Sequence, residues 1–349
     1  MNKNSGTIST CEKEVSIIVA IRNEEKHIRK CLNSLIGQTF PHDQYEIVVI
    51  DGISDDQTRE IIHEFGTNYP DIIRIFDNPS RIASAGRNIG ITNSKGKRIC
   101  IFGGHSYADP KFLRKLVDKL DSSPESTGGV GSMHLVPLDE TLSGKIIARV
   151  QMSFLGGMGT SFMNNKKDEF VKSLAFCIYR RDIFVKVGLH DETFVLGEDF
   201  ELNWRIHKAG FKLLCHSEPL VYYYRKNDTL KLFSKQMIQY GIWRMLVTKK
   251  HPDSFPIVFI MPIILLLSIA SLPIMVFLSS LLTHLIFYGL SLYITIVVIN
   301  SISHCIREKN FNNVISILFY LSEHLFFGIG LIAGVLRKIK FTNKINHLN

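Results

Sequence analysis

Residues 256–306 contain no Asp, Glu, Lys or Arg, and this stretch limits the fold more than any other feature of the chain. As one straight helix it would extend roughly 75 Å at about 1.5 Å per residue, whereas the hydrocarbon core of a bilayer is about 30 Å thick. A helix buried in a soluble core would be shorter and would have a polar face. The stretch therefore predicts two membrane spans joined by a tight turn near residues 279–285.

A third apolar stretch is less uniform, because it carries Glu323 and His324 near its middle. Charge at that depth is costly unless it faces protein or a water-filled cavity. A third full span would also place the basic tail, residues 337–349, outside, against the positive-inside rule. We favour a third span here, with a re-entrant or interfacial segment as the alternative. The membrane region over 256–336 is thus expected to contain apolar segments at about 257–280, 284–306 and 312–336.

The formal net charge of +9 is concentrated beside the apolar stretches. Basic residues flank membrane spans because of the positive-inside rule and because anionic head groups attract them. Residues 226–255 predict a basic amphipathic helix at the membrane interface. No nucleic-acid-binding motif accompanies the charge, so we expect a membrane surface, and no nucleic acid, as the partner. The flanking basic residues are Lys226, Lys231, Lys235, Arg244, Lys249, Lys250, Arg337, Lys338, Lys340 and Lys344.

The N-terminal residues 1–12 are polar, are expected to be flexible, and lack the apolar segment of a signal peptide. A domain synthesised before the first span would then remain in the cytoplasm. The six cysteines are scattered without a CxxC pair. This distribution suits a reducing compartment and argues against a zinc knuckle or a disulfide framework. We therefore expect a cytoplasmic domain over 13–225 on a cytoplasmic membrane, crossed more than once.

The first part of that domain alternates between strand-like and helix-like patterns. Short, largely β-branched runs at 15–20, 45–50, 72–76 and 98–102 are separated by helical periodicity. Such alternation predicts an α/β fold with a parallel sheet and right-handed crossovers. Ligands of these sheets bind outside the carboxyl ends of the strands. Polar clusters follow three of the expected strands, at 21–25, 51–58 and 103–106.

Three local features complete the expected pattern. Asn23 is predicted to cap the helix after the first strand, with Glu24 and Glu25 in its first turn, where the helix dipole favours anions. Residues 170–179 read as one strand. Residues 198–209 read as a helix that ends at Gly210.

Four segments resemble, in order and spacing, family 2 glycosyltransferases with the GT-A fold. They are VSIIVAIRNEEKHIRKCLNSLIGQ, EIVVIDGISDDQT, ASAGRNIGITNSKGKRICIF and GEDFELNWRIHKAG. The similarity is greatest to membrane-associated enzymes of succinoglycan and exopolysaccharide biosynthesis, which also carry a His–x–x–x–Gly–x–Gly pattern like that of His324, Gly328 and Gly330. The resemblance implies a nucleotide-sugar-binding α/β domain with a mostly parallel central sheet, followed by C-terminal transmembrane helices.

The resemblance also implies roles for residues of the first three segments. Asp51 would accept a hydrogen bond from the ring N–H of the nucleobase, which favours a UDP-sugar; the alternative is that Asp51 only caps the following turn. Glu24 and the backbone of Ile21–Asn23 would line the base and ribose pocket. Arg87 and Asn88 would reach the nucleotide, where a diphosphate needs cations or N–H donors.

Gly103–Gly104–His105 departs from the family pattern. Relatives carry Asp–x–Asp or Asp–Ala–His here and bind a divalent cation that bridges the diphosphate. Gly104 keeps its place in the nucleotide-sugar site, but Gly103 replaces the first carboxylate. Carboxylates suit Mg²⁺ and Mn²⁺ better than imidazole does. Either His105 binds the metal with phosphate and water, or cations such as Arg87 replace it.

Glu198 and Asp199 open the helix of the fourth segment. By resemblance, Asp199 is the general base that accepts the proton of the acceptor hydroxyl, and Glu198 orients substrate, although the two roles could be exchanged. An alcohol attacks an anomeric carbon poorly until its proton is accepted. The alternative is that both acids only complement the helix dipole.

These features predict an inverting transfer of a sugar from a nucleoside diphosphate to a hydroxyl of a lipid-linked saccharide, in exopolysaccharide or cell-surface glycan synthesis. Two alternatives remain. One is a polyprenyl-phosphate sugar transferase, whose acceptor would depend less on a base such as Asp199. The other is a non-catalytic nucleotide-sugar-binding subunit of a membrane assembly complex, which the glycine at position 103 would permit.

Overall fold

The computed structural model describes residues 12–156 and 167–337, and these residues form two compact units. The first unit contains residues 12–135 and 167–223, and the second contains 136–156 and 224–337. The segment 136–156 thus belongs with the C-terminal helices, not with a continuous domain over 13–225. The physical reason is that Ile146, Ile147 and Val150 bury their side chains in the core of the second unit.

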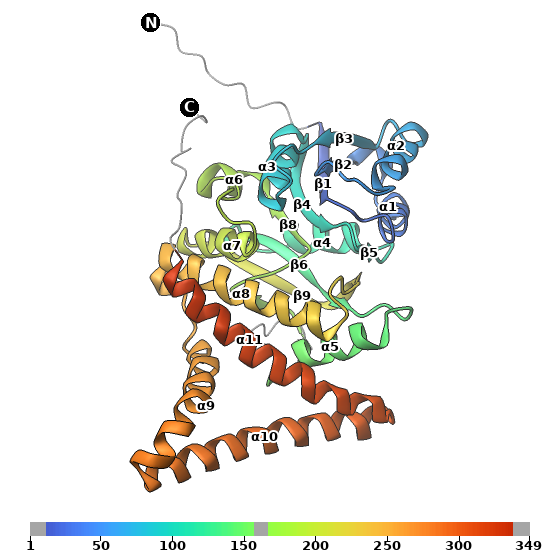
Figure 1. Ribbon diagram of the computed structural model, residues 1–349. Coiled ribbons are helices and arrows are strands. Elements are labelled where there is room, and N and C mark those ends of the chain that lie inside the picture. Colours follow the sequence, from blue (N-terminus) through green and yellow to red (C-terminus); the bar gives the residue numbers. More distant parts are fainter. Residues whose placement is uncertain (1–11, 157–166, 338–349) are drawn as a thin grey trace, which may run out of the picture. The chain divides into compact units, whose positions relative to one another are not determined.

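The first unit is an α/β domain built on a sheet of nine strands within the described residues (Figure 1). The sheet order is β3-β2-β1-β4-β8-β6-β9-β5, with β7 paired to β9. The ladders among β1 to β4 and between β6 and β9 are parallel, whereas the four antiparallel ladders are three residue pairs each. The central sheet is therefore mostly parallel. The strands are β1 (Lys13–Ile21), β2 (Tyr45–Asp51), β3 (Ile73–Asp77), β4 (Gly96–Gly103), β5 (Ser106–Ala108), β6 (Thr127–Leu135), β7 (Glu169–Val171), β8 (Cys177–Arg180) and β9 (Lys212–Tyr223).

The four strands predicted from the apolar runs are β1 to β4, and helices connect them. The central positions of β1 and β2 are buried because parallel strands inside a sheet are covered on both faces. The helices of this unit are α1 (Ile28–Ile36), α2 (Thr58–Asn68), α3 (Ala83–Asn93), α4 (Phe112–Asp121), α6 (Arg181–Val187) and α7 (Glu198–Lys208).

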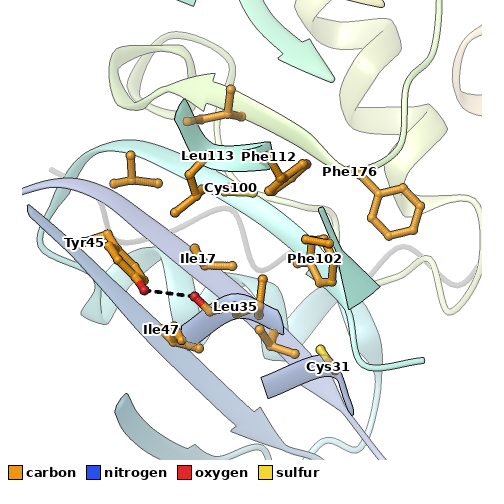
Figure 2. Packing of buried hydrophobic residues seen from close by; sticks show 14 of the residues in the cluster. Ile17, Cys31, Leu35, Tyr45, Ile47, Cys100, Phe102, Phe112, Leu113 and Phe176 are labelled. Atoms are coloured by element: carbon orange, nitrogen blue, oxygen red, sulfur yellow. Dashed lines mark hydrogen bonds between the residues drawn. The ribbon is translucent and has the colours of Figure 1, made fainter. Parts of the chain in front are cut away.

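A hydrophobic core fills the space between the sheet and helices α1 and α4 (Figure 2). Ile17 and Cys100 of the strands face Leu35 of α1 and Phe112 of α4 in this core. The hydroxyl of Tyr45 enters the core but donates a hydrogen bond to the carbonyl oxygen of Leu35 at 2.9 Å. Burial without a charged partner raises the pKa of Tyr45 to about 12.

Helix α3 approaches the sheet closely because two of its residues are glycines. A Cβ atom at Gly90 would lie 2.4 Å from Cγ2 of Ile18, and one at Gly86 would lie 3.1 Å from Cβ of Ala20. Gly86 therefore lies over the carboxyl half of β1 and Gly90 farther from that end. This packing fixes the N-terminal end of α3 at the carboxyl edge of the sheet, where ligands of parallel sheets bind.

Two local expectations were wrong. Helix α1 begins at Ile28, so Asn23 is not its cap and Glu24 is not in its first turn. Asn23 has a left-handed backbone (φ 55°), and its side-chain oxygen accepts a hydrogen bond from the backbone of Asp55 instead. The run 170–179 forms two short strands, β7 and β8, and not one. The helix expected at 198–209 is confirmed as α7, and Gly210 follows it with φ +87°.

The second unit contains five α-helices among its described residues and includes three that are long and apolar enough to cross a membrane. The candidate spans are Ile257–Leu278, Ser280–Glu308 and Phe311–Leu336. In each of the first two spans, 11% of the most apolar 18 residues are buried, so most of their side chains are exposed. In the third span, 56% of the corresponding residues are buried. The helices are α5 (Leu142–Met152), α8 (Leu230–Lys250), α9 (Ile260–Leu278), α10 (Ser280–Glu308) and α11 (Ser316–Leu336).

The charged middle of α11 is buried by protein, as a charge in the middle of a membrane span would have to be. Glu323 and His324 are both buried. The Nδ1 atom of His324 lies 2.8 Å from the hydroxyl of Tyr293 on α10, and its Nε2 atom lies 3.1 Å from the carbonyl oxygen of Leu155. Helix α11 also packs closely on α8, where a Cβ atom at Gly241 would lie 2.3 Å from the carbonyl oxygen of Phe327.

Candidate active site

The three polar clusters named from the sequence, at 21–25, 51–58 and 103–106, follow neighbouring strands at the carboxyl edge of the sheet. Ile21 is paired with Asp51 across the β1–β2 ladder, and Ala20 is paired with Gly103 across the β1–β4 ladder. The residues that follow these strand ends are therefore neighbours. The position agrees with the general rule for ligand sites in parallel sheets.

Asp51 is fully buried, and its carboxylate is occupied by protein donors. It accepts hydrogen bonds from the backbone N–H of Ser54 at 3.2 Å and from the hydroxyl of Ser54 at 2.5 Å. Arg59 adds an ion pair at 2.7 Å and also reaches Asp77 at 3.0 Å. Asp51 thus caps the turn after β2, and a nucleobase contact would use the remaining acceptor capacity of its two oxygens.

Two loops at this edge are joined by direct hydrogen bonds. The backbone N–H of Asn23 donates to the hydroxyl of Ser54 at 3.0 Å, and that of Glu24 donates to the hydroxyl of Thr58 at 2.7 Å. The side chain of Glu24 is buried. The Ile21–Glu24 segment and the 51–58 turn therefore form one structural element, which could line a nucleotide pocket through its backbone.

The two glycines of the Gly103–Gly104–His105 segment differ in how much room each has for a side chain. A Cβ atom at Gly104 would lie 2.5 Å from Cγ2 of Ile21, so a side chain is excluded there. A Cβ atom at Gly103 would make only ordinary contacts, the nearest at 3.4 Å from the hydroxyl oxygen of Ser106. Packing therefore does not explain why position 103 lacks the carboxylate of the family pattern.

The described residues do not form a complete cation site at this position. The Nδ1 atom of His105 lies 3.0 Å from a carboxylate oxygen of Glu24. Nowhere in residues 12–156 and 167–337 are three His, Cys, Asp or Glu side chains grouped as potential metal ligands. These side chains could provide two ligands at most, and a cation here would depend on phosphate oxygens and water.

Arg87 joins α3 to the first turn of α7. Its Nη1 atom forms ion pairs with Glu198, at 2.8 Å, and with Asp199. The side chain of Glu198 is 8% exposed, whereas that of Asp199 is 46% exposed. The structure thus brings together Arg87 and both acids, which the sequence had assigned to two different tasks.

Asn88 holds the segment that precedes α7. Its side-chain amide donates to the carbonyl oxygen of His190 at 2.8 Å and accepts from the backbone N–H of His190 at 2.9 Å. It also donates to Glu192 at 3.0 Å. Ser84 of the same helix donates to the carbonyl oxygen of Phe194 at 3.1 Å. Asn88 is therefore engaged with protein, although the resemblance assigns it to the nucleotide.

His190 and Arg205 are site residues that the sequence reading missed. His190 is 4% exposed and lies near Arg87 and Arg205; burial and then these two cations hold the pKa of His190 well below its usual 6.5. Arg205 binds the fully buried Glu201 and donates to the carbonyl oxygen of Leu189 at 2.7 Å. An Arg four residues after a Glu was the only signal for this pair.

Comparison with known proteins identifies the family. The model of glycosyl transferase family 2 matches residues 16–188. A glycosyltransferase of Methanococcus voltae is 32% identical over 241 residues, which cover 68% of this chain and 74% of the relative. The chain belongs to glycosyl transferase family 2. It is a glycosyltransferase, and the resemblance drawn from its motifs is confirmed.

Two relatives and one solved structure illustrate what the chain is similar to. The Methanococcus voltae protein is named dolichyl N-acetyl-α-D-glucosaminyl phosphate 3-β-D-2,3-diacetamido-2,3-dideoxy-β-D-glucuronosyltransferase. Succinoglycan biosynthesis protein ExoA of Rhizobium meliloti is 29% identical, with 67% of this chain and 70% of the relative covered. The mannosyltransferase PcManGT of Pyrobaculum calidifontis, solved with GDP-Man and Mn²⁺, has a TM-score of 0.62 at 13% identity over 92% of this chain and 87% of its own. That last similarity confirms the GT-A fold.

Proposed function

We propose that this glycosyltransferase moves a sugar, with inversion, from a nucleoside-diphosphate sugar to a hydroxyl of a lipid-linked saccharide in exopolysaccharide or cell-surface glycan synthesis. The observation that carries the proposal is the position of Asp199. Its carboxylate is half-exposed in the first turn of α7, beside the buried Glu198. Arg87 pairs it with helix α3, whose N-terminal end lies at the carboxyl edge of the sheet.

In the proposed reaction Asp199 acts as the general base. The acceptor oxygen attacks the anomeric carbon, and its proton passes to the Asp199 carboxylate as the new C–O bond forms. The bond between the anomeric carbon and the phosphate oxygen breaks, and its electron pair leaves with the diphosphate. One displacement with one base inverts the anomeric centre, and Glu198 orients substrate beside it.

The donor is proposed to be a UDP-sugar, on the basis of Asp51. The buried carboxylate is held in one orientation by Ser54 and Arg59, which would give a base-recognition group a fixed position. Glu24 and the Ile21–Asn23 backbone would complete the base and ribose pocket. Arg87 would neutralise charge on the diphosphate, and Gly104, which packs against Ile21, would contribute its backbone to the site at the strand end.

The acceptor and the location are proposed together. The Methanococcus voltae relative is named for a dolichyl-linked phosphosugar, and the Rhizobium meliloti relative for succinoglycan biosynthesis. Helices α9 and α10 expose apolar side chains along their lengths, which suits lipid contact. We place the protein in the cytoplasmic membrane as a multi-pass protein with its catalytic domain in the cytoplasm.

The test is turnover of a panel of nucleoside-diphosphate sugars by membranes that contain the wild type or Asp199→Asn. We expect transfer to a saccharide hydroxyl with UDP-sugars by the wild type and its loss in the variant. Equal turnover by the two proteins would eliminate Asp199 as the base. Transfer to polyprenyl phosphate would indicate the phosphate-acceptor alternative, and binding without turnover of any donor would indicate a non-catalytic subunit.

The divalent cation is tested separately with Gly103→Asp. This variant restores a carboxylate where the backbone leaves room for one. We propose that a cation assists the wild type weakly, and that the variant binds Mn²⁺ more tightly by about tenfold or more, the size of effect that supporting ligands have in metal sites. The measurement is Mn²⁺ titration of the protein with UDP present. Unchanged Mn²⁺ affinity in the variant would show that position 103 does not lie at the cation.

A further inference from the structure

Arg87 occupies a position that conflicts with two assigned functions. A guanidinium beside a carboxylate favours the ionised form and weakens the carboxylate as a proton acceptor. Asp199 is paired with Arg87 and could not act well as a base in this arrangement. Arg87 itself, while it is paired with two acids, is not available to a diphosphate. Both functions therefore require that this contact open.

The contact is built in a way that allows it to open. Glu198 and Asp199 both contact the same guanidinium nitrogen, Nη1. Arg59 also reaches two acids, Asp51 and Asp77, through one Nη1, but there one of the acids is fully buried. Arg29 instead uses the forked geometry and binds both carboxylate oxygens of Glu64, at 2.8 and 2.7 Å. Bidentate pairs of that kind are the strong ones. A diphosphate offers Arg87 several oxygens and the forked geometry that the two acids do not provide.

The backbone around Arg87 is fixed, so opening would involve side chains. Helix α3 is held to the sheet through Gly86 and Gly90. Ser84 and Asn88, on either side of Arg87 in the sequence, are hydrogen-bonded to the segment 190–194 that leads to α7. Two rigid elements therefore face each other across the Arg87–Asp199 pair, whose acid is half-exposed.

We propose that Arg87 is a positioning residue that masks Asp199 until the donor binds. The donor diphosphate takes the Arg87 guanidinium from Glu198 and Asp199, and the freed Asp199 carboxylate then accepts the proton of the acceptor. Donor binding would thus precede formation of the functional base. This inference rests on the proposed function and adds to it a masking contact that the donor releases.

The proposal makes a counterintuitive prediction for the purified full-length protein in detergent, with UDP as the probe. Asp199→Asn removes a competitor for Arg87, so UDP binds the variant more tightly than the wild type. We expect about fivefold, the strength of a partly exposed ion pair. Glu198→Gln should also tighten UDP binding, because it removes the other acid that pairs with Arg87. Arg87→Met weakens UDP binding.

A double-mutant cycle separates competition for Arg87 from a general effect of removing negative charge. If the proposal holds, Asp199→Asn gives no gain in UDP affinity when Arg87→Met is already present. Glu192→Gln is the matched control, because it removes a carboxylate from the same segment whose contact is with Asn88. We expect Glu192→Gln to leave UDP affinity unchanged.

The outcomes distinguish the two levels of the argument. The masking role would be overturned if Asp199→Asn still raised UDP affinity in the presence of Arg87→Met, or if Glu192→Gln raised UDP affinity as much as Asp199→Asn does. Unchanged or weaker UDP binding by both Asp199→Asn and Glu198→Gln, with a wild type that binds UDP and turns over, would also overturn it. A wild type that binds no nucleoside diphosphate at all would instead contradict the proposed function.

Discussion

Among the arginine–carboxylate clusters in the described part of the α/β unit, two at the carboxyl edge of the sheet are built differently. In the cluster of Arg59, Asp51 and Asp77, the central carboxylate is fully buried and also receives hydrogen bonds from Ser54, a few residues away. In the cluster of Arg87, Glu198 and Asp199, the partners are 112 residues apart and Asp199 is half-exposed. The buried carboxylate of the first cluster is held by several protein donors, as a fixed scaffold should be. The second joins separate elements through contacts that a ligand could replace.

The largest expected effect tests whether the second cluster performs chemistry. Asp199→Asn should lower kcat by about 10²- to 10⁴-fold, the range for loss of a general base. Glu198→Gln should lower it less, because Glu198 is buried and is assigned only to orientation. Initial rates with a saturating donor measure both. A greater loss of kcat in Glu198→Gln than in Asp199→Asn would mean that Glu198 is the base and Asp199 orients substrate. The control is Asp182→Asn, which changes an exposed carboxylate paired with Lys186 and should leave kcat unchanged.

The next effect concerns the support behind the second cluster. Arg205→Met removes the guanidinium that pairs with the fully buried Glu201 on α7 and also holds the carbonyl oxygen of Leu189. Breaking a buried ion pair from one side costs about 3–5 kcal/mol of unfolding free energy. Urea titration of the purified protein in detergent measures it.

An exposed pair in the same region provides the comparison for Arg205. Lys186→Met breaks an ion pair of which both members are half-exposed, and it should cost about 0.5 kcal/mol or less. Similar losses in the two variants would mean that Arg205 contributes no more to the stability of α7 than a surface pair does.

A matched substitution then compares the two clusters directly. Asp51→Asn places an amide against the N–H and O–H donors of Ser54 and against Arg59, and should cost about 1.5–3 kcal/mol of unfolding free energy. Asp199→Asn changes a half-exposed group and should stay within about 0.5 kcal/mol of the wild type. Equal stability losses would remove the distinction between a fixed and an exchangeable cluster.

The sequence predicted the elements that depend on local pattern. The four strands and the helix of Glu198 and Asp199 follow from apolar runs and helix signals, and the family follows from motifs in order. The candidate site residues of the sheet edge could be placed because parallel strands end on one side. Whether these residues act as assigned remains a prediction.

Other features depend on contacts between distant segments, which no local pattern encodes. Asn23 has a left-handed backbone and is hydrogen-bonded to Ser54 and Asp55 of the 51–58 turn, contacts that its own sequence neighbours do not predict. The segment 136–156 reads as part of the α/β domain until Ile146 and Val150 are seen to pack in the core of the helical unit. The sequence assigns Arg87 to the nucleotide, and its pairing with Asp199, 112 residues away, is visible only in the structure.

The smallest expected effect uses pH to probe the surroundings of the second cluster. His190 is neutral in the fold, since burial and the charges of Arg87 and Arg205 hold its pKa well below 6.5. Below about pH 6.5 the unfolded chain binds a proton that the folded protein does not, so stability falls as pH is lowered, by up to about 1.4 kcal/mol per pH unit. His190→Phe should flatten this slope between pH 6.5 and 5, and it retains the backbone hydrogen bonds to Asn88. A slope in His190→Phe equal to that of the wild type would mean that burial and the cations beside Asp199 do not hold this imidazole neutral.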